Sequence, residues 1–406
     1  MSDGQAVDRP VEDGPVHEGP TAAASVEERA RRWRLVLGGA SAEALGATLS
    51  GADAGMDRAL AAVYEPGEDR AAGLQGSAPR VARWLGDIRT YFPSTVVQVV
   101  QRDAVDRLGL HRLLLEPELL GSVEPDVHLV GTLLSLTRAL PEATRATARQ
   151  VVRTVVEQIE ARVADRTRSA VSGALDRSAR TSRPRLRDVD WDRTIRANLR
   201  HYQPEQRTVV PERLVGHARR SQVVARDVVL AVDQSGSMAA SVVYSAVFGA
   251  VLASMRTLRT SLVVFDTAVV DLTDQLDDPV DVLFATQLGG GTDINRAVAY
   301  CQGLVRRPGD TLFVLISDLY EGGVREELLR RVQAMLGAGV QVLVLLALSD
   351  EGAPSYDGEL AAELAALGAP AFACTPDAFP DLLAVALARG DVDAWVQREQ
   401  RAARGR

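Results

Sequence analysis

Apolar and polar positions alternate in blocks along the C-terminal half of the chain. Short apolar runs predict buried strands at residues 228–232, 261–265, 311–317, 340–348 and 371–374, with a short edge strand near 268–272. Helical patterns lie between them, at residues 238–257, 279–286, 294–305, 324–337, 358–367 and 376–388. Strands that alternate with helices of this length predict parallel βαβ units with right-handed crossovers. We therefore expect an α/β domain over residues 226–390, with a doubly wound, mostly parallel sheet, that folds on its own.

The N-terminal half shows helical periodicity only. Ser25 and Glu28 form a capping-box pattern at the start of one helix, which Gly38 ends. Further helices are predicted at residues 56–63, 78–90, 94–108, 127–140 and 141–175. The last of these carries an apolar stripe, and its length of about two or three heptads favours packing in a bundle over a dimerising coiled coil. We predict an all-α domain over residues 25–175.

The composition is typical of a soluble globular protein. It is 46% hydrophobic and 25% charged, and no apolar run approaches the roughly 20 residues of a membrane span. Residues 1–24 hold five acidic residues and three prolines and are predicted to be disordered, and residues 391–406 form a charged tail. The start of the chain lacks the basic region and apolar core of a signal peptide, so we expect a cytoplasmic protein. Cys301 and Cys374 are expected to be buried and free.

The charges of the chain are distributed unevenly, and all 46 Lys and Arg positions are arginine. The absence of lysine excludes a lysine nucleophile and a phosphate-binding loop of the Gly-Lys-Ser/Thr type. Residues 176–226 hold 13 arginines against six acidic residues, although the whole chain has a net charge of −8. We interpret residues 176–225 as an arginine-rich neck that docks against an acidic face of this chain or of a partner. Nucleic acid is the less favoured alternative, because only Trp191, His201 and Tyr202 offer stacking there.

Hydroxyl and carboxylate side chains gather after the predicted strands. Asp233, Ser235 and Ser237 follow the first strand in an Asp-x-Ser-x-Ser pattern, and Asp318 ends the strand at 311–317. Three glycines before Thr292 free the backbone at the start of a helix. In a doubly wound sheet these loops meet at one edge, where such sheets bind ligands. Hydroxyl and carboxylate oxygens are the ligands that Mg²⁺ prefers, so the sequence predicts a metal site.

Together these three patterns resemble the metal-ion-dependent adhesion site of von Willebrand factor type A (VWA) domains. The resemblance implies that Mg²⁺ or Mn²⁺ is held by Asp233, Ser235, Ser237, Thr292 and Asp318. The three hydroxyls would bind directly and the two carboxylates directly or through water, which leaves one position free for an Asp or Glu of a partner. Asp266 and Asp293 are expected to be structural. The Asp233 loop is expected to be exposed, so that replacing Asp233 would cost little stability.

The order of the segments along the chain indicates which group of VWA proteins the sequence resembles. A helical N-terminal region, an arginine-rich approach and then the Asp-x-Ser-x-Ser strand are similar to CoxE-like VWA proteins, over roughly residues 185–390. Such proteins are associated with AAA+ ATPases of the MoxR class. The resemblance therefore implies a non-catalytic protein-interaction module, an adaptor for a MoxR-like ATPase in complex remodelling or metallocofactor insertion.

A metal-dependent hydrolase is the alternative, with its general base supplied from another loop or subunit. Against it, none of the five histidines lies in a predicted metal loop, and the sequence around Ser235 lacks the Gly-x-Ser-x-Gly pattern. Phosphate release by the purified chain with Mg²⁺ or Mn²⁺ would distinguish the two classes. An extracellular adhesin is a third interpretation, which the missing signal peptide disfavours.

Overall fold

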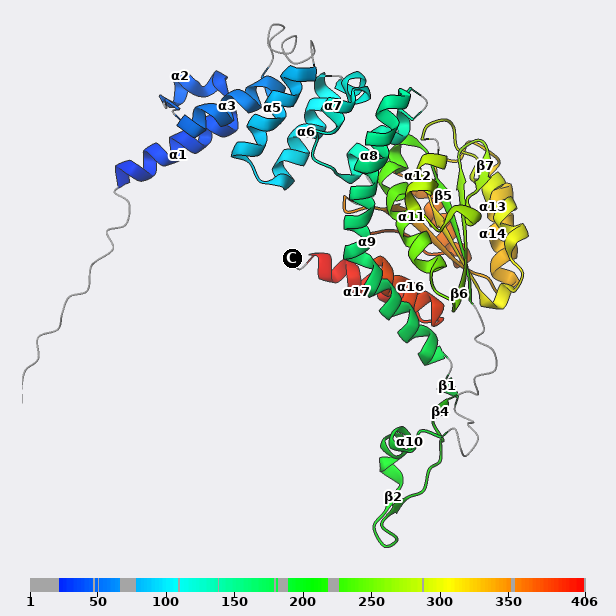
Figure 1. Cartoon of the computed structure of the whole chain (residues 1–406). Coiled ribbons are helices and arrows are strands. Elements are labelled where there is room, and N and C mark those ends of the chain that lie inside the picture. The colour runs from blue at the N-terminus through cyan, green and yellow to red at the C-terminus, as the bar shows by residue number, and fades with distance from the viewer. Residues whose placement is uncertain are drawn as a thin grey trace, which may run out of the picture. The chain divides into compact units, whose positions relative to one another are not determined.

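The computed structural model in Figure 1 describes residues 22–46, 48–49, 51–65, 78–108, 110–137, 139–178, 180–181, 189–217, 226–286, 288–351 and 355–404. The chain divides into two compact units, one up to Glu124 and one from Pro125 onward. Most of the N-terminal segment predicted to be disordered lies outside the described residues. So do several arginines of the neck, namely Arg183, Arg185, Arg187, Arg219 and Arg220.

The described residues of the N-terminal unit are mainly helical. The helices are α1 (Ala22–Leu37), η1 (Gly39–Ser41), α2 (Ala42–Leu45), α3 (Gly51–Tyr64), α5 (Ala78–Tyr91), α6 (Ser94–Leu108), η2 (Leu110–Leu115) and α7 (Pro117–Leu120). The α-rich character of this part was predicted correctly. The capping box was not, because α1 begins before Ser25, at Ala22. The Glu28 carboxylate instead accepts hydrogen bonds from Arg31 at 2.8 Å and Arg32 at 2.7 Å.

The C-terminal unit contains a six-stranded sheet in the order β10-β9-β8-β5-β6-β7. Its strands are β5 (Arg226–Asp233), β6 (Leu258–Phe265), β7 (Val269–Asp271), β8 (Thr311–Ile316), β9 (Gln341–Leu348) and β10 (Ala371–Cys374). Neighbouring strands are parallel except for β6 and β7, which are antiparallel. Because the chain extends the sheet from β5 first to one side and then to the other, the sheet is doubly wound. This confirms the predicted fold class.

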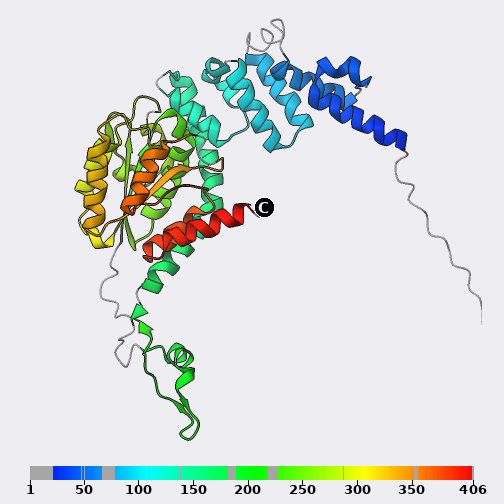
Figure 2. The same ribbon diagram turned by 180° about the vertical axis from the view of Figure 1, so that it is seen from behind.

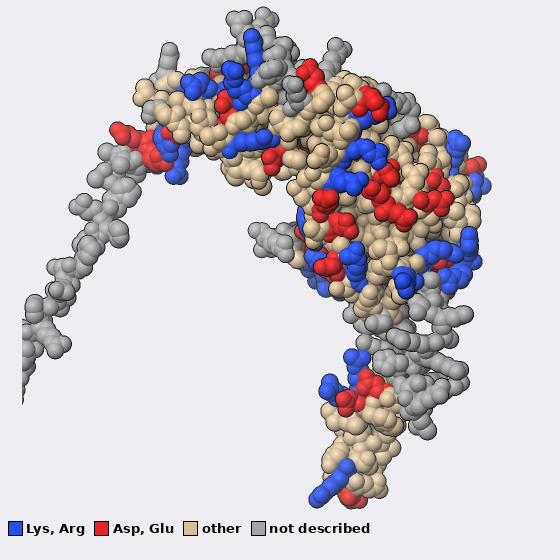
Figure 3. All heavy atoms as spheres, viewed as in Figure 1, with Lys and Arg blue, Asp and Glu red and all other residues tan. Residues whose placement is uncertain are grey.

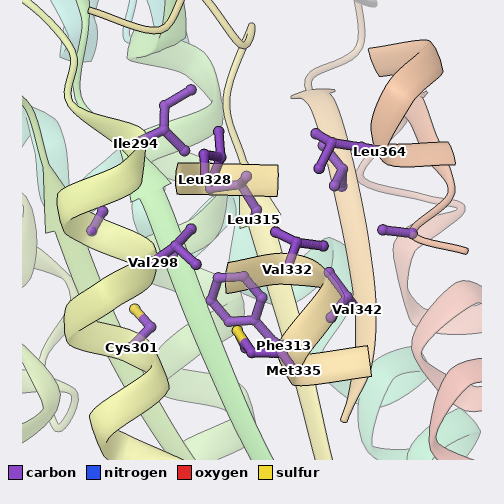
Figure 4. Close-up of a cluster of buried hydrophobic side chains, with 14 of the residues drawn as sticks. Ile294, Val298, Cys301, Phe313, Leu315, Leu328, Val332, Met335, Val342 and Leu364 are labelled. Carbon is purple, nitrogen blue, oxygen red and sulfur yellow. The ribbon is translucent and has the colours of Figure 1, made fainter. Parts of the chain in front are cut away.

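Helices cover both faces of the sheet (Figures 1 and 2). They are α11 (Ala239–Ala253), α12 (Pro279–Ala285), α13 (Ile294–Leu304), α14 (Arg325–Gly337), α15 (Gly358–Leu367) and α16 (Phe379–Leu387). Figure 4 shows one face, where Phe313 of β8 lies in one buried cluster with Val298 of α13 and Met335 of α14. On the other face, the rings of Phe248 in α11 and Phe379 in α16 meet edge to face, with centroids 4.6 Å apart. Both free cysteines are buried, as predicted.

Two helices of the predicted N-terminal domain belong to the C-terminal unit instead. These are α8 (Val127–Ser135) and α9 (Glu142–Ser178), which contact α11, and α9 also contacts α16. The apolar stripe of α9 supplies the contact, with Val152 and Val171 fully buried. Gly131 allows the close approach of α8, because a Cβ there would lie 2.8 Å from that of Ala239. The boundary between the compact units therefore lies near residue 125 rather than near residue 175.

Arginines of α9 form ion pairs with aspartates of the C-terminal unit. Arg162 bonds both Asp350, at 3.0 Å, and Asp377, at 2.7 Å, and Arg166 bonds Asp381 at 2.7 Å. Nearer the start of α9, Arg149 and Arg153 pair with Asp281 and Asp278 in the same manner. Figure 3 shows acidic and basic groups interspersed over one face of this unit. The ion pairs flank the apolar contact that α9 makes with α11 and α16.

The long apolar segment of the C-terminal unit is a core helix. Residues Gly236–Ala253, which include α11, match a membrane-spanning helix in length and composition, yet 67% of this stretch is buried inside the protein. The sheet covers one side of it, and α8 and α9 cover the other. The last described element is α17 (Val392–Arg404) in the predicted tail, and the ring of its Trp395 lies 6.2 Å from that of Phe372.

Candidate metal centre

Asp233 lies at the carboxyl end of β5, between β6 and β8 in the middle of the sheet. Its side chain is fully buried, with 0% exposure. One carboxylate oxygen accepts a hydrogen bond from the Ser235 backbone N–H at 2.8 Å, and the other accepts one from the Ser317 hydroxyl at 2.8 Å. The loop is exposed at Gly236 and Ser237, as expected, but the Asp233 side chain is buried and bonded to Ser317, which directly follows β8. Its replacement by alanine therefore leaves the Ser235 N–H, which is half-buried, and the Ser317 hydroxyl, which is buried, without this acceptor.

Ser235 and Ser237 follow Asp233 in the same turn, and Ser237 contacts Asp318, which lies just after β8. The hydroxyls of Ser235 and Ser237 are 3.2 Å apart, and the Ser237 hydroxyl donates to Asp318 Oδ2 at 2.6 Å. Ser237 is exposed and Ser235 is half-buried, so this side of the cluster is open to solvent. The ends of β5 and β8 are thus joined by a continuous set of hydroxyl and carboxylate oxygens.

A strained turn holds Asp318 in place. Leu319 has a φ of 66°, a left-handed conformation that is costly for a bulky residue, and its side chain is fully buried. The Leu319 N–H donates to the Ser317 hydroxyl at 3.0 Å, and the Asp318 carbonyl accepts from the Asp357 N–H at 2.9 Å. Burial of Leu319 therefore fixes the backbone on either side of the Asp318 carboxylate.

The loop before α13, residues 288–293, contacts the loops that follow β5 and β8 through its backbone. The Gly289 N–H donates to the Gln234 carbonyl at 3.1 Å, and the Gly322 N–H donates to the Thr292 carbonyl at 2.8 Å. Gly289 and Gly290 have φ values of 113° and 112°, which non-glycine residues rarely adopt. Within the described residues, the Thr292 hydroxyl forms no hydrogen bond to the other four predicted ligands. The backbone of this loop is therefore bonded to the loops that follow β5 and β8, and the Thr292 side chain is not joined to the other four residues.

The two additional acidic residues have structural roles. Asp293 is the N-cap of α13, and its carboxylate accepts from the Arg296 N–H at 2.8 Å. The Asp293 N–H in turn donates to the Asp266 carbonyl at 2.8 Å. The Asp266 carboxylate accepts from the Ala268 N–H at 2.6 Å and so closes the turn after β6.

The oxygen cluster formed by Asp233, Ser235, Ser237 and Asp318 contains two carboxylates without a basic partner in the described part of the chain. Among the described residues, no arginine or histidine forms an ion pair with Asp233 or Asp318. Burial raises the pKa of the Asp233 carboxyl, the hydrogen bonds from Ser235 and Ser317 lower it, and the nearby Asp318 carboxylate raises it again. Two carboxylates with two hydroxyls and no counter-charge suit a hard divalent cation such as Mg²⁺ or Mn²⁺. Histidine and cysteine are not involved, and the described chain brings together no group of three His, Cys, Asp or Glu side chains for a metal.

Two residues near the site were not singled out from the sequence. Ser317 donates a hydrogen bond to Asp233. The sequence feature that could have identified it is a hydroxyl at the end of an otherwise apolar predicted strand. Glu321 accepts from the Gly323 N–H at 2.6 Å and from the Asn295 N–H at 3.2 Å, which links the β8 loop to α13. Burial raises the pKa of Glu321, and the Asp293 carboxylate adds to the effect. The signal for Glu321 was its position directly before two glycines.

Replacing Gly322 with Ala is expected to lower the free energy of unfolding by about 1–3 kcal/mol, because the new Cβ would meet a rigid backbone atom. That Cβ would lie 2.6 Å from the Thr292 carbonyl oxygen, whereas one at Gly303 on the exposed side of α13 would meet nothing within 4 Å. Urea denaturation of both variants measures the difference. Gly303→Ala should be neutral or stabilising, by up to about 1 kcal/mol. Equal stability of the two variants would show that the loops containing Gly322 and Thr292 can move apart without a loss of free energy of unfolding.

A doubly wound sheet with this oxygen cluster at the ends of its central strands defines a VWA domain. The family described as "VWA domain containing CoxE-like protein" matches residues 163–383, and the chain belongs to this family. It is 38% identical over 365 residues to YehP of Escherichia coli (strain K12), a match that covers 87% of this chain and 95% of YehP.

Solved structures resemble the chain only distantly. An aerotolerance-related membrane protein from Bacteroides fragilis and BatB from Bacteroides thetaiotaomicron are 15% and 16% identical, each with a TM-score of 0.32. Each match covers 41% of this chain and 100% of the other chain. The Ro protein of Deinococcus radiodurans is 13% identical over 91% of this chain and 95% of its own, with a TM-score of 0.24. Likenesses at this level carry no functional information.

Proposed function

We propose that this protein is a metal-dependent protein-interaction module. The ion would be Mg²⁺ or Mn²⁺, held by Asp233, Ser235, Ser237, Thr292 and Asp318. When bound, it would supply a hard Lewis-acid position for a carboxylate of a partner protein. The observation that carries the proposal is the pair of carboxylates without a counter-charge in the described structure; Asp318 is bonded to the exposed Ser237 hydroxyl and Asp233 to the buried Ser317 hydroxyl.

Exposed apolar side chains around the cluster support binding rather than catalysis. Tyr320 and Val324 each have 51% of their surface exposed, and Tyr356 has 43%. Tyr320 follows Asp318 by two residues, and its hydroxyl contacts the Ser355 hydroxyl beside Tyr356. Tyrosines in such positions are typical of interfaces, where they add contact area around a central polar anchor. We therefore propose that these three residues form the rim of the partner-binding surface.

The partner that we propose is an AAA+ ATPase of the MoxR class. This rests on membership of the CoxE-like VWA family, whose members are associated with such ATPases. The chain would then act as an adaptor between the ATPase and a client protein, in complex remodelling or metallocofactor insertion. An Asp or Glu of the ATPase would be the group that reaches the ion.

The test is retention of purified MoxR-class ATPases from the same organism on the immobilised full chain. Retention should require Mg²⁺ or Mn²⁺, stop in EDTA, and fall at least about tenfold with Ser237→Ala or Thr292→Ala, because each removes one oxygen from the site. The control is Ser254→Ala, where the lost hydroxyl is exposed and only contacts the Val251 carbonyl at the end of α11. An ATPase that is retained equally in EDTA and by the Thr292 variant would rule out the metal-bridged contact.

A further inference from the structure

The neck module, residues 189–217, is held together by polar groups. It comprises α10 (Trp191–Ala197), η4 (Leu199–His201), β2 (Tyr202–Gln203) paired with β3 (Thr208–Val209), and β4 (Gly216–His217), which pairs with β1 (Arg180–Thr181). Among its residues with a described exposure, only Thr194 and Asn198 are buried. The Asn198 side chain donates to the carbonyls of Thr194 and Arg213, at 2.6 and 2.8 Å. It also accepts from the N–H groups of Glu212 and Arg213, both at 3.1 Å.

The large apolar side chains of the module lie on its surface. Trp191, Ile195 and Leu199 are 51%, 43% and 57% exposed, and Tyr202 is 49% exposed. Trp191 and Ile195 are four residues apart on one face of α10, and Leu199 begins η4 directly after the C-cap Asn198. In Figure 3 much of the module surface between its charged ends carries no charged group. These side chains are not needed to hold the module, and large exposed apolar groups that gather in one place mark interaction sites.

The exposed residues line a groove with a positive character. The groove has a volume of about 450 Å³, and its lining includes Trp191, Ile195, Leu199, Tyr202 and Arg207 but no carboxylate. Arg207 stands in the β2–β3 turn with a φ of 47° and forms no ion pair within the described part of the chain. By contrast, Arg193 and Arg200 are paired with Asp190 and Glu212. The groove thus offers an apolar floor and one unpaired guanidinium.

We propose that the groove binds a short acidic segment of a partner protein that carries a large apolar side chain. The apolar side chain would fill the groove, and a carboxylate beside it would pair with Arg207. The net excess of seven arginines over residues 176–226 would attract such a segment from a distance, in a way that salt screens. Because the apolar groove is concave, it suits a protruding side chain of a protein better than it suits a flat lipid surface. The groove itself contains one arginine, Arg207, so it offers one contact to a phosphate, whereas its apolar lining suits a large apolar side chain.

The test uses the full chain as bait for a display library of random 12-residue peptides. Selected peptides are expected to share a large apolar residue flanked by Asp or Glu. Fluorescence anisotropy should then show binding at least about tenfold weaker to Trp191→Ala and Leu199→Ala, since truncation of a central anchor has effects of this size. Arg207→Glu should weaken binding as well. None of these side chains is buried, so the variants are expected to fold normally.

Matched controls lie elsewhere on the C-terminal unit. Val270→Ala removes a side chain that is 40% exposed on β7, and Arg256→Glu reverses an exposed charge after α11. Neither should alter peptide binding, and neither should EDTA, which separates this site from the metal centre. The proposal is overturned if no acidic-apolar peptide is enriched or if the groove variants bind the peptides as well as the wild type does. Three other partners are tested with the same variant: anionic phosphatidylglycerol vesicles, single-stranded RNA and, by light scattering, a second copy of the chain. The proposal is also overturned if Trp191→Ala abolishes binding to one of these while peptide binding is unchanged.

Discussion

Replacing Asp233 with Asn is expected to abolish Mg²⁺ and Mn²⁺ binding while the fold is retained. The substitution removes a negative charge from the predicted site but keeps its size. The amide oxygen can still accept from Ser235, and the Ser317 hydroxyl can turn to accept from the new NH₂ group. Isothermal titration calorimetry should show a loss of affinity larger than the roughly 10–100-fold that loss of an outer-shell contact causes. Without metal, the variant should be at least as stable as the wild type, because repulsion between Asp233 and Asp318 is gone.

Two further variants make this experiment specific. Asp293→Asn should bind the metal normally, because Asn caps a helix as well as Asp does and Asp293 is the N-cap of α13. Asp233→Ala should lose metal binding and also about 1–3 kcal/mol of stability, since it leaves the Ser235 N–H and the Ser317 hydroxyl without an acceptor. Unchanged metal affinity in Asp233→Asn would remove Asp233 from the site. Loss of affinity in Asp293→Asn would move the site toward α13.

A fragment that begins at Pro125 is expected to unfold cooperatively, whereas one that begins at Arg226 is not. The second fragment lacks α8 and α9, and so exposes the apolar surfaces of α11 and α16 that they cover. Val152, Val155, Val163 and Val171 of α9 are each no more than 2% exposed. Burial of a valine stabilises a protein by about 1.5 kcal/mol or more, so together they approach the roughly 5–15 kcal/mol of a whole domain. Thermal and urea denaturation followed by circular dichroism measure both fragments.

Single substitutions in the longer fragment provide the control. Val155→Ala should lower the free energy of unfolding by about 1–3 kcal/mol, whereas Gln158→Ala on the exposed face of α9 should change it by less than about 0.5 kcal/mol. Cooperative unfolding of the fragment that begins at Arg226 would show that α9 is dispensable. It would also restore the sequence-based view that residues 226–390 fold alone.

The sheet was predictable because buried parallel strands are continuous apolar runs, and those at 311–317 and 340–348 match β8 and β9 closely. The position of α9 was not, because its apolar stripe requires a covering surface but does not specify which one. The cluster of Asp233, Ser235, Ser237 and Asp318 followed from topology, which brings strand ends to one edge. The burial of Asp233 and its bond to Ser317 did not, since Ser317 follows β8 and lies 84 residues later in the chain. The metal itself stays a prediction.

The ion pairs of α9 have a consequence for how its attachment responds to solution conditions. Every cation in the set is an arginine, which stays protonated at any pH that proteins encounter. Arg162 lowers the pKa of Asp377, so this contribution to stability is present above the ordinary pKa of aspartate and is lost only as the pH falls below it. The pairs are 41–53% exposed at Arg162, Asp350 and Asp377, where dissolved ions screen them. The contribution of these ion pairs to the attachment of α9 is therefore insensitive to pH near neutrality and is reduced by salt, whereas salt does not screen the apolar contact of α9.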